Sequence, residues 1–99
     1  MHVCEQYGDT LDFFSYVILF APNFPAEDGI TLDQALSNLR HGLAAVERNT
    51  KDVESLQMLK ACAEELSRTY SLYESGNVLD AEKHLQLARE WFRKSHGNS

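Results

Sequence analysis

The longest uninterrupted amphipathic pattern in the chain runs from residue 52 to residue 75, without a glycine or a proline. Its apolar residues recur at alternating steps of three and four, which places them on one stripe of an α-helix. They are Leu56, Leu59, Ala63, Leu66, Tyr70 and Tyr73, and a second, weaker apolar margin contains Met58, Ala61, Cys62 and Leu72. Such a wide apolar sector normally contacts more than one neighbour, so we expect this helix to be the centre of a bundle.

The same periodicity predicts helices over residues 31–48 and 78–94. The first begins with a capping box, in which the Thr31 hydroxyl and the Gln34 side chain each satisfy a backbone amide. Gly42 interrupts this helix at a cost of about 1 kcal/mol relative to alanine, unless a neighbouring segment packs closely there. The expected inward positions are Leu32, Ala35, Leu36, Leu39, Leu43 and Val46 in one helix, and Val78, Ala81, Leu85, Ala88 and Phe92 in the other.

Residues 11–20 form the most apolar run of the chain, and their aromatic and β-branched residues favour a strand. A single strand among helices would have no hydrogen-bonding partner, so we predict a helix over 9–20, capped by Asp9 or Thr10 and ended by Pro22. The run is too short to cross a bilayer as a helix. A signal peptide has basic residues before its apolar segment, and no Lys or Arg precedes this run. A helix this apolar is either central in the bundle or half of a subunit interface.

The 99 residues suffice for one hydrophobic core. The sequence therefore predicts a single all-α domain, a small antiparallel bundle of four helices at about 9–20, 31–48, 52–75 and 78–94, with flexible ends at 1–8 and 95–99. Cys4 and Cys62 are too few for a disulfide framework, and we expect both to be reduced thiols in a cytoplasmic protein. Cys4 falls in the loose lead-in, and Cys62 beside a core stripe.

The charge of the chain is negative and uneven. Nine basic residues stand against fifteen acidic ones, a net charge of −6, and residues 1–50 contain seven acids but only Arg40 and Arg48. Nucleic-acid binders usually carry the opposite sign, so DNA or RNA is not the expected partner. A partner steered by charge should instead be basic and should meet the N-terminal half.

The sequence contains no strong catalytic or metal-binding motif. The four histidines are widely separated, no H-E-x-x-H or C-x-x-C spacing occurs, and the five glycines form no phosphate loop, so we predict no metal site and no cofactor. One enzymatic alternative comes from Arg89 and His96, which are separated by six residues near the end of the last helix. This spacing resembles the Arg-x(4–6)-His signature of HEPN ribonucleases, dimers of four-helix bundles, and the resemblance implies RNA cleavage by this pair.

Three features coincide in residues 9–36: the apolar helix, a phenylalanine framed by Pro22 and Pro25, and five acidic residues. Exposed aromatic side chains with a polar rim are typical of protein interfaces. The predicted partner-binding residues are Phe13, Tyr16, Phe20, Phe24 and Asp28, and the acids of this stretch are Asp9, Asp12, Glu27, Asp28 and Asp33. The surface would form a symmetric homodimer or receive a basic, amphipathic segment of another protein. In the opposing interpretation the rings of the helix are buried in the monomer and Phe24 plugs the end of the bundle.

The function that these observations favour is a non-catalytic protein-interaction or regulatory module that associates with itself or with another protein. Two alternatives stay open. One is the HEPN-like ribonuclease dimer that uses Arg89 and His96, and the other is a structural subunit that docks into a larger assembly through residues 11–20.

Overall fold

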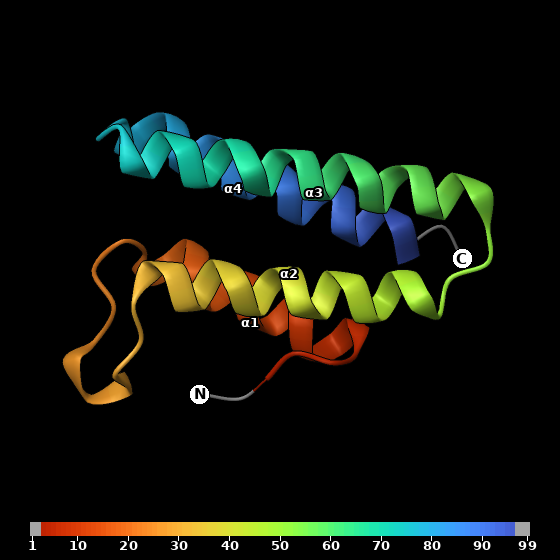
Figure 1. Ribbon diagram of the computed structural model, residues 1–99, viewed down its shortest axis with the longest axis horizontal. Helices are drawn as coiled ribbons and strands as arrows, with labels where there is room; N and C mark the ends of the chain where they lie inside the picture. Colours follow the sequence, from red (N-terminus) through yellow and green to blue (C-terminus); the bar gives the residue numbers. More distant parts are fainter. Residues whose placement is uncertain (1–2, 97–99) are drawn as a thin grey trace.

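A computed structural model of the protein describes residues 3–96. In that range it contains α-helices and one 3₁₀ turn, and no strand. The elements are α1 (Tyr7–Phe20), η1 (Ala26–Asp28), α2 (Leu32–Arg48), α3 (Val53–Glu74) and α4 (Val78–His96). Successive helices run in opposite directions, so the predicted all-α antiparallel bundle of four helices is confirmed (Figure 1).

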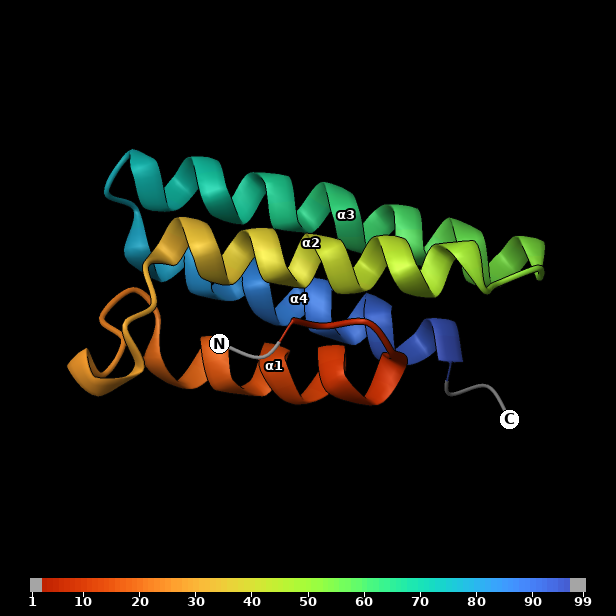
Figure 2. The same cartoon turned by 60° about the horizontal axis from the view of Figure 1, so that its bottom comes forward.

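The helices form two layers, with the α1–α2 hairpin packed against the α3–α4 hairpin (Figures 1 and 2). Each helix contacts two others: α1 lies against α2 and α4, and α3 lies against α2 and α4. The α3–α4 contact is the most extensive, because Ala81 and Ala88 let the two backbones approach closely. None of the helices in the described range is long and apolar enough to cross a membrane.

The ends of the long helices follow from local hydrogen bonds. Thr31 Oγ1 accepts a bond from the Gln34 amide at 3.2 Å, and Gln34 Oε1 accepts one from the Thr31 amide at 3.0 Å, which completes the predicted capping box. Asp52 caps α3 by accepting from the Ser55 amide at 2.9 Å. Gly76, at a φ of 84°, makes the left-handed turn into α4.

The first residues of the chain differ from the prediction. Residues 1–8 were expected to be a flexible lead-in; residues 1 and 2 lie outside the described range, but α1 begins at Tyr7 and Cys4 is buried. The Cys4 amide donates to Asn38 Oδ1 at 2.9 Å, and His41 Nδ1 donates to the Cys4 carbonyl oxygen at 2.9 Å. This N-terminal arm, residues 3–6, is therefore attached to α2. A buried backbone amide and carbonyl need hydrogen-bonding partners, and α2 supplies both for Cys4.

The other end of the chain also differs. Residues 95–99 were predicted to be flexible, but Ser95 and His96 are the last residues of α4, which ends two residues later than predicted. Ser95 Oγ donates to the carbonyl oxygen of Phe92 at 2.6 Å, a bond that helps to end the helix. The remaining residues of the predicted end, 97–99, lie outside the described range.

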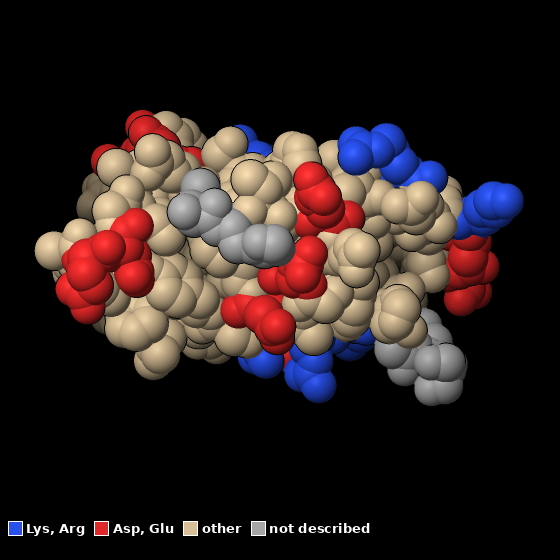
Figure 3. Space-filling view, turned by 90° about the horizontal axis from the view of Figure 1, so that it is seen from below, with Lys and Arg blue, Asp and Glu red and all other residues tan. Residues whose placement is uncertain are grey.

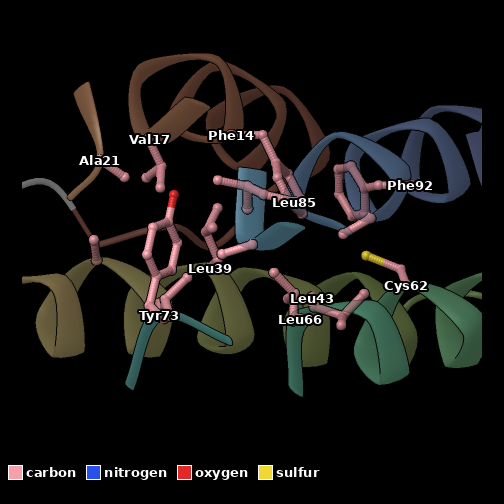
Figure 4. Close-up of a cluster of buried hydrophobic side chains, with 14 of the residues drawn as sticks. Phe14, Val17, Ala21, Leu39, Leu43, Cys62, Leu66, Tyr73, Leu85 and Phe92 are labelled. Carbon is pink, nitrogen blue, oxygen red and sulfur yellow. The ribbon is translucent and has the colours of Figure 1, made fainter. Parts of the chain in front are cut away.

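The buried stripe of α3 is rotated relative to the prediction. Cys62 was placed in a weak margin but is fully buried, whereas Ala63 and Tyr70 are only half-buried. The buried residues of α3 are Leu59, Cys62, Glu65, Leu66, Thr69 and Tyr73, and Figure 4 shows Cys62 and Leu66 close to Leu85 and Phe92. The rotation arises because α4 packs against α3 more extensively than α2 does.

Gly42 is the point where α1 and the N-terminal arm approach α2 most closely. A Cβ atom built on Gly42 would lie 2.7 Å from Cys4 Cβ and 2.9 Å from Thr10 Cγ2, both too short for van der Waals contact. The close approach explains why a glycine is tolerated in the interior of α2 despite its low helix propensity.

We expect Gly42→Ala to lower the free energy of unfolding by up to about 2 kcal/mol. The clash of the new methyl group, about 1–3 kcal/mol for an overpacked site, exceeds the roughly 1 kcal/mol gain in helix propensity. The matched control is Gly8→Ala in α1, where an added Cβ meets nothing within 4 Å, so stability should be unchanged or slightly higher. Urea denaturation of both variants measures the difference. Equal stability of the two would contradict the close approach.

Candidate functional site

A hollow of about 540 Å³ opens on the surface between α1, the N-terminal arm and η1. We call it the α1 hollow. Apolar and acidic side chains line it, namely Cys4, Asp9, Asp12, Phe13, Tyr16, Glu27, Asp28 and Ile30. Three of the five residues predicted to bind a partner are in this set, and the other two, Phe20 and Phe24, contact Tyr16. The structure therefore brings all five together.

The aromatic residues of α1 form one continuous stripe. Phe13, Tyr16 and Phe20 follow one another at steps of three and four, so they project from the same side of the helix. The ring of Tyr16 stacks on that of Phe13, with centroids 5.5 Å apart, and lies 5.1 Å from that of Phe20. Phe24, from the loop that follows, stacks on Tyr16 at 5.7 Å. Tyr16 is thus the centre of a four-ring aromatic cluster.

This aromatic stripe lies at the edge of the core and not within it. The side of α1 that faces the bundle carries Thr10, Phe14 and Val17, which are fully buried. Tyr7 faces α4, where its ring stacks on that of Phe92. Phe13, Tyr16 and Phe20 are each partly buried, and Phe13 and Tyr16 pack against the edge of the core.

Carboxylates surround the aromatic floor of the hollow. Asp9 and Asp12 approach from α1, and Glu27 and Asp28 approach from η1. None of the lining residues, all within the described part of the chain, is Lys or Arg. Figure 3 shows the same asymmetry on the face formed by the α1–α2 layer, where acidic side chains occupy the middle and left and basic ones lie toward the margins. The hollow is therefore a region of negative potential.

One acid of the predicted rim lies elsewhere. Asp33, at the start of α2, does not line the hollow; it lies near the hydroxyl of Tyr70 on α3, whose pKa is raised by a hydrogen bond to Glu74 and by the charge of Asp33.

A hydrogen bond joins the loop to α1 at the rim of the hollow. The Tyr16 hydroxyl donates to Asp28 Oδ2 at 2.5 Å. This hydrogen bond, followed by partial burial and by the negative charges of Asp28 and Glu27, raises the pKa of Tyr16 to about 12. Tyr16 therefore stays protonated under physiological conditions and holds η1 beside the aromatic stripe.

The sequence prediction missed two lining residues, Cys4 and Ile30. Cys4 was missed because the N-terminal arm was taken as flexible. A signal for the arm was present: Asn38 lies between apolar positions of α2, and a polar residue on a buried stripe needs a hydrogen-bonding partner. That partner is the Cys4 amide. Burial raises the pKa of the Cys4 thiol to about 11, which favours the neutral thiol over the thiolate.

The two residues of the ribonuclease alternative lie on α4, away from the α1 hollow. They are two helical turns apart on the flank that faces α1, where the His96 ring stacks on that of Tyr7 with centroids 4.0 Å apart. Arg89 Nε is buried and makes no hydrogen bond to another described residue. The positions place Arg89 and His96 on one side of the helix, and their chemistry stays a prediction.

A second polar cluster links α3 to α4. The buried carboxylate of Glu65 accepts a hydrogen bond from His84 Nδ1 at 2.5 Å and another from Arg68. Arg68 lies on α3 and His84 lies on α4, so the hydrogen bonds of Glu65 connect the two helices. Within residues 3–96, no group of three or more His, Cys, Asp or Glu side chains is placed to hold a metal ion.

Comparison with known proteins gives no match: no protein family, no curated protein and no solved structure is similar enough to this chain to be matched.

The hydrogen bond between Tyr16 and Asp28 can be tested by titration. We expect Asp28→Ala to lower the pKa of Tyr16 from about 12 toward the ordinary value near 10, because both the acceptor and its charge are lost. Glu27→Ala, the matched control, removes only a weak charge interaction and should lower the pKa much less. The ¹³Cζ chemical shift of Tyr16 followed by NMR from pH 8 to 13 reports the value directly.

The sign of the pH effect follows from the raised pKa. Since the folded protein holds this proton more tightly than the unfolded chain, the bond contributes to stability below pH 10, and this contribution is lost as the pH rises through 12. A Tyr16 pKa that is the same in the native protein and in Asp28→Ala would show that the hydrogen bond does not form.

Proposed function

We propose that this chain is a non-catalytic protein-interaction module, and that the aromatic stripe of α1, with the α1 hollow, is its contact surface. The observation that carries the proposal is that Phe13, Tyr16 and Phe20 stay only partly buried along one flank of α1, where Phe13 and Tyr16 line the acidic α1 hollow. Aromatic rings of this kind bury a large area at a small cost in side-chain entropy, and an acidic rim adds selectivity. The same surface would serve the alternative of a structural subunit that docks through residues 11–20.

The chemistry of the hollow supports recognition over reaction. Its titratable groups are four carboxylates, the Tyr16 phenol, whose pKa is raised to about 12, and the Cys4 thiol, whose pKa is raised to about 11. A nucleophilic cysteine needs the opposite shift, toward the thiolate, which nearby cations or a helix N-terminus would supply. Carboxylates around an aromatic floor are instead suited to hold cationic and apolar groups of a partner at the same time.

The ribonuclease alternative is less favoured by the electrostatics of the chain. A net charge of −6 repels a polyanion, and RNA binding is dominated by contacts to phosphates. The interaction module needs no such contact. For this reason we retain the cleavage of RNA by Arg89 and His96 as the second candidate and the interaction module as the first.

Photo-crosslinking in the source cells tests the contact surface. A photoreactive phenylalanine analogue in place of Phe20 retains the ring at the edge of the stripe, at a position that is partly exposed in the monomer. We expect irradiation to give a discrete adduct of higher mass, either with this chain or with another protein, which mass spectrometry identifies.

The matched control carries the analogue at Leu79, which is the more exposed position, at 76% of its full accessible area, but lies on α4 away from the aromatic stripe. It should give no such adduct. If neither position gives an adduct, or if both give the same one, the aromatic stripe is not the contact surface.

A further inference from the structure

We infer that the partner of the aromatic stripe is a cationic amphipathic helix of another protein, and not a second copy of this chain. The inference rests on the proposed function and specifies the occupant of the same surface. Three properties of the surface support this inference: the length and spacing of its rings, the sign of its charge, and the effect of that charge on a symmetric dimer.

The shape of the surface fits a helix. Phe13, Tyr16 and Phe20 present rings at helical spacing along α1, whose 14 residues extend for about 21 Å. Two helices pack when side chains at steps of three and four on one fit between those of the other. A partner of about four turns with an apolar stripe would cover these rings, and one of its apolar side chains would enter the hollow beside Phe13 and Ile30.

The charge of the surface selects a cationic partner. The hollow carries the formal charge of four carboxylates, and no lining residue in the described range compensates it with a Lys or Arg. Asp12 is exposed at the outer side of α1, where an incoming Lys or Arg reaches it first. Each exposed ion pair contributes only about 0.2–1 kcal/mol, but several such pairs along one helix raise both the association rate and the selectivity for a basic partner.

The same charge disfavours a symmetric dimer through this surface. A two-fold interface places identical patches against each other, so the four carboxylates of one copy would face the four of the other. Like charges across an interface are unfavourable, and nothing basic in the lining offsets them. Binding of a cationic helix and dimerisation of this chain also respond differently to salt. Screening weakens the binding of a cationic helix and strengthens the association of like-charged copies.

Fluorescence anisotropy with defined peptides tests the inference. The probe is a labelled 18-residue helical peptide with leucines at steps of three and four and lysines elsewhere, and a second peptide has glutamates in place of the lysines. We expect the lysine peptide to bind the native chain and the glutamate peptide not to bind. Raising the salt from 20 to 200 mM should weaken the binding.

Two charge reversals with the same change in net charge locate the site. Asp12→Lys lies on the outer side of α1 and should weaken binding of the lysine peptide about tenfold, since it replaces an attraction with a repulsion. Glu54→Lys, at an exposed position in the first turn of α3, should change the affinity less than about twofold. Both variants alter exposed residues and should keep the native circular dichroism spectrum, which is checked first. Tyr16→Ser should also weaken binding of the lysine peptide, because the central ring of the aromatic stripe is lost.

The outcomes separate this inference from the function on which it rests. Equal binding of the two peptides, or equal effects of the two reversals, would overturn the cationic-helix inference. So would a dimer of the native chain, seen by sedimentation equilibrium, that Phe20→Ser dissociates, since the occupant would then be a second copy. In that case the Phe20 adduct would contain this chain, and the interaction module itself would stand. A missing adduct at Phe20 would remove the module and the inference together.

Discussion

The position of α1 depends on one close approach, that of Thr10 and Cys4 to the backbone of Gly42. Because no side chain separates the elements there, α1 lies against α2 with Thr10 at the contact. Phe14 and Val17, four and seven residues further on, must then point into the bundle, where both are fully buried. A larger residue at position 42 would move α1 outward and change which face of α1 packs into the core.

The rotation of α1 at this contact also decides which of its aromatics remain outside. With Phe14 inward, the neighbouring stripe of Phe13, Tyr16 and Phe20 falls on a flank that the loop covers only in part. Phe24 and the bond from Tyr16 to Asp28 hold that loop against the stripe, so the acids of η1 lie beside the aromatic rings. An apolar surface within a negative rim is thus a consequence of how α1 packs.

The N-terminal arm completes the hollow from the other side. Its backbone is held by Asn38 and His41 of α2, and both anchors lie within one turn of Gly42. The same segment of α2 therefore positions the inner face of α1 and the arm. The α3–α4 hairpin takes no part in lining the hollow and contributes the core against which α1 and α2 are held, with Leu66, Leu85 and Phe92 at its centre.

Periodicity and capping predict the helices of this chain well because both are local. The capping box at Thr31 and the turn at Gly76 lie where the sequence places them, and the five residues chosen for a partner surface do come together. The burial of Cys4, the rotation that buries Cys62 and the separation of Asp33 from the rim could not be predicted in this way. They depend on contacts between segments more than 30 residues apart or on the relative rotation of packed helices, which a stripe about 100° wide leaves undetermined.

The central claim is that two aromatic residues of α1, six positions apart in the sequence, have opposite roles: Phe14 belongs to the core, and Phe20 belongs to the surface. The free energies of unfolding of Phe14→Ala and Phe20→Ala, measured by urea denaturation under identical conditions, test it most directly. Phe14 is fully buried, so its truncation should cost about 3–5 kcal/mol, whereas truncation of the partly buried Phe20 should cost about 1 kcal/mol. Equal losses for the two variants would place the aromatic stripe in the core and contradict the account.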